Sequence, residues 1–140
     1  MDRLLERLLI ARKALDTLQE LVSITRPTPV ERDAAIQRFE YTFETTWKAA
    51  QRYLLIQEGL EVGSPKAAIR SAREVGLLND TQTQLGLEMT DDRNLTVHTY
   101  NEALSKAIFA KLSTYAGLCR WWLEEMNQRV KRGADHGSEP

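Results

Sequence analysis

The sequence is poor in the residues that build disulfides and metal sites. It holds one cysteine, Cys119, and two histidines, His98 and His136. One cysteine excludes an intrachain disulfide, and two histidines without Cys-x-x-Cys or His-Glu-x-x-His leave too few zinc ligands. Gly-x-Gly-x-x-Gly and Walker A sequences are absent as well. We therefore predict no metal and no cofactor.

The sequence also lacks a strong charge of either sign and any long apolar run. Its 19 lysines plus arginines nearly balance 20 aspartates plus glutamates, for a formal net charge of −1. Overall charge thus favours neither a nucleic-acid nor a membrane partner, and an RNA contact would need a local patch. No run approaches the ~20 apolar residues of a membrane span, and charges near residue 1 exclude a secretory signal. We expect a cytoplasmic protein with no membrane or DNA partner.

Helical periodicity is what the sequence has in abundance. Apolar residues recur every three or four positions along three stretches, which is the spacing of one helix face. The first predicts a helix near residues 2–24 that ends before Pro27, because proline fixes φ and lacks an amide hydrogen. The second predicts a helix of about 28 residues ending at Gly59, and the third a last helix of roughly 30 residues. The three stripes are Leu4, Leu8, Ala11, Leu15, Leu18 and Val22; Ile36, Phe39, Phe43, Trp47, Ala50 and Leu54; and Leu104, Ile108, Leu112, Tyr115, Cys119, Trp122 and Met126.

Two shorter helices are predicted between the long ones. Ser64 can cap free amides and Pro65 suits a first helical position, so a helix should run from there to Gly76. Another should open at Asn79 and continue to about Met89, followed by a loop over 91–99. No stretch alternates with the period of a strand.

These elements predict an all-α fold, an up-and-down bundle of four to five helices. One domain should cover 1–132, and residues 133–140 should form a disordered tail. The near-heptad stripe of the first helix, and Trp121 beside Trp122, suggest apolar surface outside the core. Such surface is typical of a dimer interface, although a well-packed monomer is an equal alternative at this point.

A polar segment before the last helix carries residue types suited to phosphodiester chemistry. Arg93 could hold a phosphate, and the imidazole of His98 could take or return a proton of a ribose 2′-hydroxyl. Asn94 could orient the histidine or the phosphate, and Tyr100 offers a hydroxyl for substrate binding or modification. The spacing alone is weak, because Asn94 could equally cap a helix while His98 satisfies a turn.

The wider sequence resembles a known family. Arg93-Asn94-x3-His98-x-Tyr100 is similar to the Arg-x4-His-x-Tyr motif of HEPN proteins found beside minimal nucleotidyltransferases. The similarity extends to Phe39-Glu40-Tyr41-Thr42-Phe43-Glu44 with Trp47-Lys48, to Ser64-Pro65-Lys66 and to Gly76-Leu77-Leu78. It covers about residues 29–126 and resembles the nucleotidyltransferase substrate-binding branch. Gly86 departs from the pattern, since relatives often carry a bulky aromatic there.

The resemblance implies a HEPN-like homodimer in which two Arg93/His98 pairs face a shared cleft. It also implies a separately encoded minimal nucleotidyltransferase as partner. In toxin–antitoxin versions the HEPN member is a metal-independent ribonuclease, and some transferases inactivate it by adding adenylyl groups (AMPylation) to the tyrosine that corresponds to Tyr100. Members of the substrate-binding branch were instead named for presenting substrate to the transferase.

Three hypotheses follow from these residues and from the resemblance. The first is a ribonuclease in which His98 is general base or acid, Arg93 stabilises the phosphate and Asn94 positions both, leaving a 2′,3′-cyclic phosphate. The alternative is a non-catalytic nucleotide- or substrate-binding subunit of a two-component nucleotidyltransferase. The third is a helical adaptor whose motif is only a capping turn.

Overall fold

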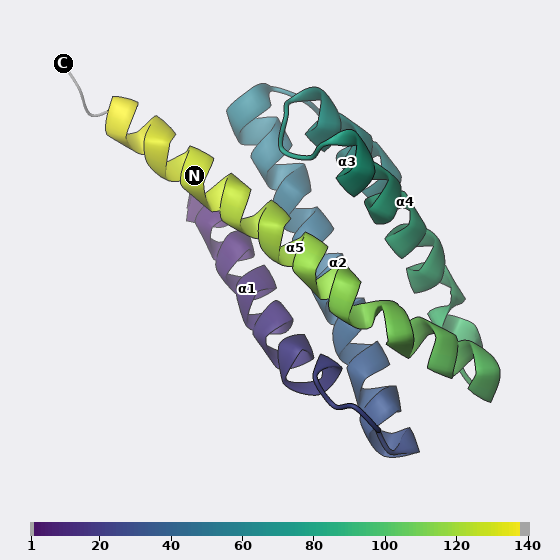
Figure 1. Cartoon of the computed structure of the whole chain (residues 1–140). Coiled ribbons are helices and arrows are strands. Elements are labelled where there is room, and N and C mark those ends of the chain that lie inside the picture. Colours follow the sequence, from purple (N-terminus) through teal and green to yellow (C-terminus); the bar gives the residue numbers. More distant parts are fainter. Residues whose placement is uncertain (1, 138–140) are drawn as a thin grey trace.

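The chain folds into a bundle of helices, shown by a computed structural model that describes residues 2–137 (Figure 1). Its long helices are packed together, with α5 crossing α1 and α2 obliquely. The shorter helices α3 and α4 lie together on the side of α2 opposite α1. The described residues contain no strand, so the predicted all-α bundle is confirmed. The elements are α1 (Asp2–Val22), α2 (Pro29–Glu58), α3 (Pro65–Glu74), α4 (Asp80–Leu95), the 3₁₀ turn η1 (Thr96–His98) and α5 (Glu102–Gly137).

Local signals in the sequence fix where the helices begin and end. Thr28 caps α2 in a capping box, accepting from the Glu31 amide while the Glu31 side chain accepts from the Thr28 amide. Ser64 caps α3 as predicted, with its hydroxyl accepting from the Ala67 amide at 3.2 Å. Gly59 ends α2 in the left-handed conformation at φ 67°, where a side chain would be strained.

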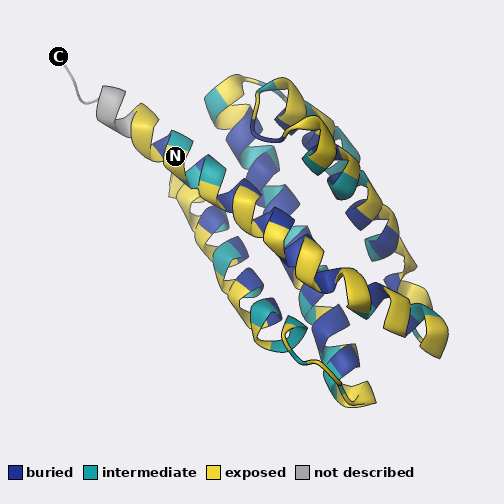
Figure 2. Ribbon diagram, in the orientation of Figure 1, coloured by how far each residue is buried: buried dark blue, intermediate teal, exposed yellow. Residues whose placement is uncertain are grey.

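The predicted apolar stripes form the core (Figure 2). All six stripe residues of α2 and five of the six in α1 are buried, and so are the α5 stripe residues after Leu104. Phe39 of α2 stacks on Tyr115 of α5 with ring centroids 5.6 Å apart, which links the two longest helices. The heptad-like stripe of α1 is therefore used inside the monomer, and the apolar surface that α1 leaves exposed belongs to Leu5, Leu9 and Ile10.

Gly86 lies where α4 approaches α3 closely. A Cβ built on Gly86 would come within 3.2 Å of Ile69 Cγ2, which is tighter than an ordinary packing contact. The missing side chain thus lets α4 pack directly on the buried Ile69. Gly86 therefore has a packing role in this chain.

Two predicted boundaries differ from the structure. The predicted loop over 91–99 was wrong, because α4 continues to Leu95 and is followed directly by η1. The last helix also passes the predicted boundary at Gly133 and continues to Gly137, with residues 138–140 lying outside the described part. A single glycine costs a helix only about 1 kcal/mol, which does not stop a long one.

None of the helices in residues 2–137 combines the length and apolar character needed to span a bilayer.

Candidate functional site

The four predicted site residues lie on one short stretch where α4 ends and α5 begins. Arg93 and Asn94 occupy the last turn of α4, His98 ends η1, and Tyr100 stands in the turn before α5. Threonine side chains stabilise this stretch, since the Thr96 hydroxyl donates to the Arg93 carbonyl at 2.7 Å. The predicted site is therefore a continuous helical end and not an open loop.

His98 and Tyr100 contact each other. The Tyr100 hydroxyl lies 3.4 Å from His98 Nδ1, and the rings meet edge to face with centroids 6.0 Å apart. Both side chains are exposed, and Tyr100 keeps 85% of its surface open to solvent. The two groups that could move a proton or accept a modification are thus within hydrogen-bonding reach of each other and of a ligand.

The two acidic residues before Arg93 are held by lysines from other helices. Asp91 pairs with Lys66 of α3 at 2.7 Å, and Asp92 pairs with Lys111 of α5 at 3.2 Å. Neither carboxylate forms an ion pair with Arg93 in the described residues. The run Asp-Asp-Arg, which looks neutralised in the sequence, therefore leaves its arginine charge uncompensated in the fold.

Arg93 itself is half-buried and available to an anion. Its Nε is buried and has no hydrogen-bond partner in the described part of the chain. No hydrogen bond or ion pair from its terminal nitrogens is present in the described part either, so these donors are left for a phosphate oxygen. Asn94 is exposed on the same turn, and no hydrogen bond among the described residues joins Arg93 or Asn94 to His98.

A buried network that the sequence did not predict holds this helical end in place. Asp92, only 8% exposed, accepts hydrogen bonds from the Tyr115 hydroxyl and from Lys111. Burial and the Asp92 carboxylate raise the pKa of Tyr115 above its ordinary value, which favours the neutral, donating phenol. Hydrogen bonds to Glu88 and Asp92 raise the pKa of Lys111. Only the periodicity that places Tyr115 on the buried face of α5 hinted at this partner.

A shallow hollow of about 320 Å³ lies beside Tyr100, between the start of α2 and the start of α5. Arg32 of α2 is 8% exposed at this hollow and donates from Nε to the Ser105 hydroxyl at 3.1 Å. Glu102 lies 3.9 Å from its guanidinium. Arg32 adds a second cation near Tyr100. The sequence gave no sign of this neighbour, because Arg32 lies far from the motif along the chain.

The arrangement could bind a phosphodiester and transfer a proton. Arg93 offers fork-like donors for a phosphate, and His98 offers an imidazole that can take or return a proton. Among the side chains of residues 2–133, no three His, Cys, Asp or Glu converge in a way that could hold a metal ion. The roles assigned to the four residues remain predictions from the sequence.

The bundle and its Arg-x4-His-x-Tyr segment define a HEPN-type protein of the nucleotidyltransferase substrate-binding branch. The chain belongs to the family described as nucleotidyltransferase substrate binding protein like, which it matches over residues 6–128. The match includes the whole segment from Arg93 to Tyr100, so the resemblance predicted from the sequence is confirmed.

Individual relatives agree with this assignment. A probable ribonuclease HepT of Haemophilus influenzae is 30% identical over 100 residues, which are 68% of this chain and 66% of that protein. A crystal structure from Thermus thermophilus shares 61% identity with a TM-score of 0.82, over 83% of this chain and 98% of that one. A Haemophilus influenzae structure described as the fold of a substrate-binding domain of a nucleotidyltransferase has a TM-score of 0.70 at 23% identity, over 86% and 98% of the two chains. At 23% identity, the similarity to this last structure shows a shared fold alone.

Proposed function

We propose that the chain is a metal-independent endoribonuclease paired with a separately encoded minimal nucleotidyltransferase that neutralises it. The observation that carries this proposal is the uncompensated charge of Arg93 in the same helical end as the exposed His98. The relative named as a probable ribonuclease supports it. An arginine for the phosphate and a histidine for the proton are the minimum that this chemistry needs.

In the proposed reaction, His98 takes the proton of a ribose 2′-hydroxyl, whose oxygen attacks the adjacent phosphorus. The bond to the 5′-oxygen breaks, and the imidazolium of His98 returns its proton to that oxygen, which leaves as a 5′-hydroxyl. The other product is a 2′,3′-cyclic phosphate. Arg93 binds the non-bridging oxygens as negative charge builds on them, and Asn94 orients the phosphate or the imidazole by its amide.

Replacement of His98 by alanine tests the proposal directly. A positioned acid or base contributes roughly 100- to 10,000-fold to rate, so His98→Ala should lower cleavage of purified RNA by at least about 100-fold. The matched control is His136→Ala, which removes the other histidine of the sequence. Circular dichroism should show that both variants fold. Undiminished cleavage by folded His98→Ala would reject the assignment.

The family and one structural relative favour a second candidate function. Both are described as substrate-binding components of a nucleotidyltransferase. In this alternative the same helical end holds a nucleotide or phosphorylated substrate for the transferase and cleaves nothing. It predicts no RNA turnover by the purified wild-type chain, together with transferase activity that falls when Arg93 is replaced by glutamine.

We further propose that the active form is a homodimer in which two copies of the Arg93–Tyr100 stretch share one cleft. Exposed apolar side chains beside the motif support this, since Val97 is 69% exposed and Leu95 41% exposed. Sedimentation of the purified chain should then give twice the 16.0 kDa mass of one copy. A monomer at micromolar concentration would contradict the shared cleft.

A further inference from the structure

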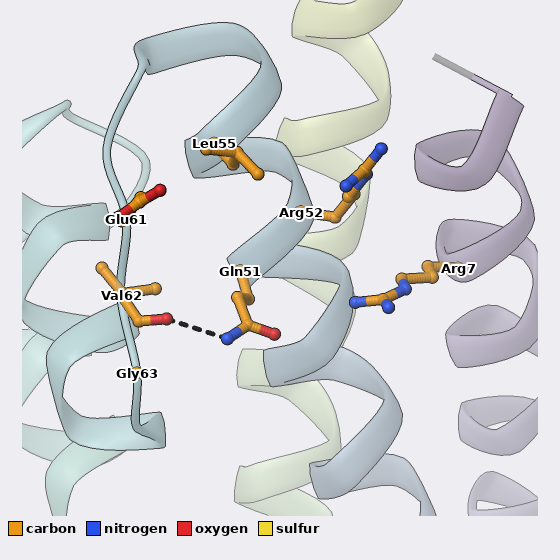
Figure 3. Close-up of a pocket in the computed structure, with 7 residues that line it drawn as sticks. All are labelled: Arg7, Gln51, Arg52, Leu55, Glu61, Val62 and Gly63. Carbon is orange, nitrogen blue, oxygen red and sulfur yellow. Dashed lines mark hydrogen bonds between the residues drawn. The ribbon is translucent and has the colours of Figure 1, made fainter.

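A second cationic hollow lies between α1, α2 and the loop after α2 (Figure 3). It encloses about 450 Å³. Arg7 reaches it from α1, while Gln51, Arg52 and Leu55 reach it from α2, and residues 61–63 close one side. Two arginines from different helices therefore face one space.

Neither arginine is neutralised by a carboxylate. No ion pair to Arg7 or Arg52 is present among the described residues, although nine other lysines and arginines do pair with acids. Arg7 donates from Nη1 to the Lys48 carbonyl at 3.2 Å, which fixes its guanidinium and leaves other donors free. The Nε of Arg52 is buried without a hydrogen-bond partner in the same part of the structure. An anion between the two guanidiniums could accept from their terminal N–H groups.

The remaining charges leave the region positive. Lys48 and Glu44 line a further hollow of about 290 Å³, which Arg7 also lines. Glu61 is the carboxylate on the main hollow. Three cations thus face two carboxylates, while the chain as a whole carries a formal charge of −1.

This hollow is distinct from the Arg93–Tyr100 stretch. Arg32, beside Tyr100, and Arg52 lie on the same helix, and at 1.5 Å per residue they are about 30 Å apart. The two sites therefore lie toward opposite ends of α2 and can be altered separately.

We propose that the hollow between Arg7 and Arg52 binds the phosphate groups of a mononucleotide, of the nucleoside-triphosphate class. Arginine forks from two helices can each hold phosphate oxygens in a bidentate manner. The volume falls within the range of sites for small molecules, and Leu55 and Val62 supply apolar surface for a base or sugar. The proposal does not depend on ribonuclease activity.

Calorimetric titration of the full chain with ATP, tripolyphosphate and adenosine tests the proposal. ATP and tripolyphosphate should bind saturably and adenosine should not, because the arginines recognise phosphate. Arg52→Gln and Arg7→Gln should each weaken ATP binding at least tenfold. Glu61→Gln should tighten it, since a like charge is removed from the hollow.

Two control variants distinguish binding at this site from a general effect of positive charge and from binding at the Arg93–Tyr100 stretch. Arg120→Gln removes one exposed arginine of α5 outside the hollow and should leave ATP binding unchanged. His98→Ala should bind ATP as the wild type does, because His98 lies in the other site. Non-saturable ATP binding, equal weakening by Arg120→Gln, or loss of binding in His98→Ala would overturn the proposal. Binding of a single-stranded oligoribonucleotide through Arg52 without ATP binding would also overturn it. Thermal unfolding checks each variant, and Arg7→Gln decides the outcome if Arg52→Gln does not fold.

Discussion

The hydroxyl of Tyr115, in the middle of α5, donates a hydrogen bond to the buried carboxylate of Asp92, the residue directly before Arg93. This contact joins the core of the longest helix to the last turn of α4. Lys111, one turn earlier in α5, reaches the same carboxylate. The position of the proposed phosphate-binding arginine therefore depends on a polar contact inside the bundle.

Replacement of Tyr115 by phenylalanine should destabilise the fold. The variant keeps the stacking on Phe39 but leaves Asp92 with one donor fewer, which should cost about 1–3 kcal/mol in unfolding free energy. Urea unfolding measures the loss. Tyr41→Phe is the matched control, because Tyr41 is 56% exposed and should change stability by less than about 0.5 kcal/mol. Equal effects of the two variants would show that the Asp92 contact contributes nothing.

A side chain at Gly86 should disrupt the contact between α3 and α4. Gly86→Val should lower stability by about 1–3 kcal/mol, because its Cβ would press on Ile69. Ile69→Ala should reduce this effect in the double variant, as a double-mutant cycle would reveal. Gly117→Ala provides the control: a Cβ at that position of α5 meets nothing within 4 Å, so stability should rise by about 0.5–1 kcal/mol. Additive effects of the first two changes would contradict the close approach.

Alkaline pH should weaken the fold through Cys119. Burial raises the pKa of the Cys119 thiol to about 12, whereas an unfolded thiol ionises near ~8.5. The folded chain thus retains a proton that the unfolded chain loses, so stability is undiminished below about pH 8.5 and falls as pH rises toward about 12. The slope should reach about 1.4 kcal/mol per pH unit.

The pKa values of Tyr115 and Lys111 are also raised in the fold. They change stability only above the ordinary pKa values of tyrosine and lysine, so measurements from about pH 8.5 to about pH 10 isolate the effect of Cys119. Unfolding free energies across that range should decline for the wild type and stay level for Cys119→Ala. A thiol reagent should also label Cys119 only on unfolding. Equal slopes in the two proteins would disprove the assignment to this thiol.

Tyr100 should be the target if the partner transferase regulates the chain by modification. Its hydroxyl is highly exposed and lies beside His98, so an adenylyl group there would cover the proposed catalytic histidine. Mass spectrometry after co-expression with the transferase should find the adduct on Tyr100 and none on the exposed Tyr41. Tyr100→Phe should escape modification and keep the proposed RNA cleavage in the presence of the transferase. An unmodified Tyr100 in the presence of active transferase would count against this regulation.

Much of the fold could be predicted from the sequence because helix signals are local. The apolar stripes identified the buried faces of α1, α2 and α5, and Ser64 and Gly59 marked helix ends by their own backbone chemistry. The prediction of a loop over 91–99 was wrong, because the helical spacing of buried residues continues there in polar side chains. Met89, Asp92 and Thr96 keep the spacing of a buried face, yet Asp92 carries a carboxylate that only Tyr115 and Lys111 of another helix satisfy.

The sequence by itself determined that the chain is an all-α bundle and where Arg93, His98 and Tyr100 lie relative to its last helix. Only the tertiary structure decided which charges remain free. Asp91 and Asp92 adjoin Arg93 in the chain, but Lys66 and Lys111 from other helices take both carboxylates. Likewise, Arg7 and Arg52 meet at one hollow only because α1 packs on α2. Charge pairing depends on distances in space, which residue order cannot specify.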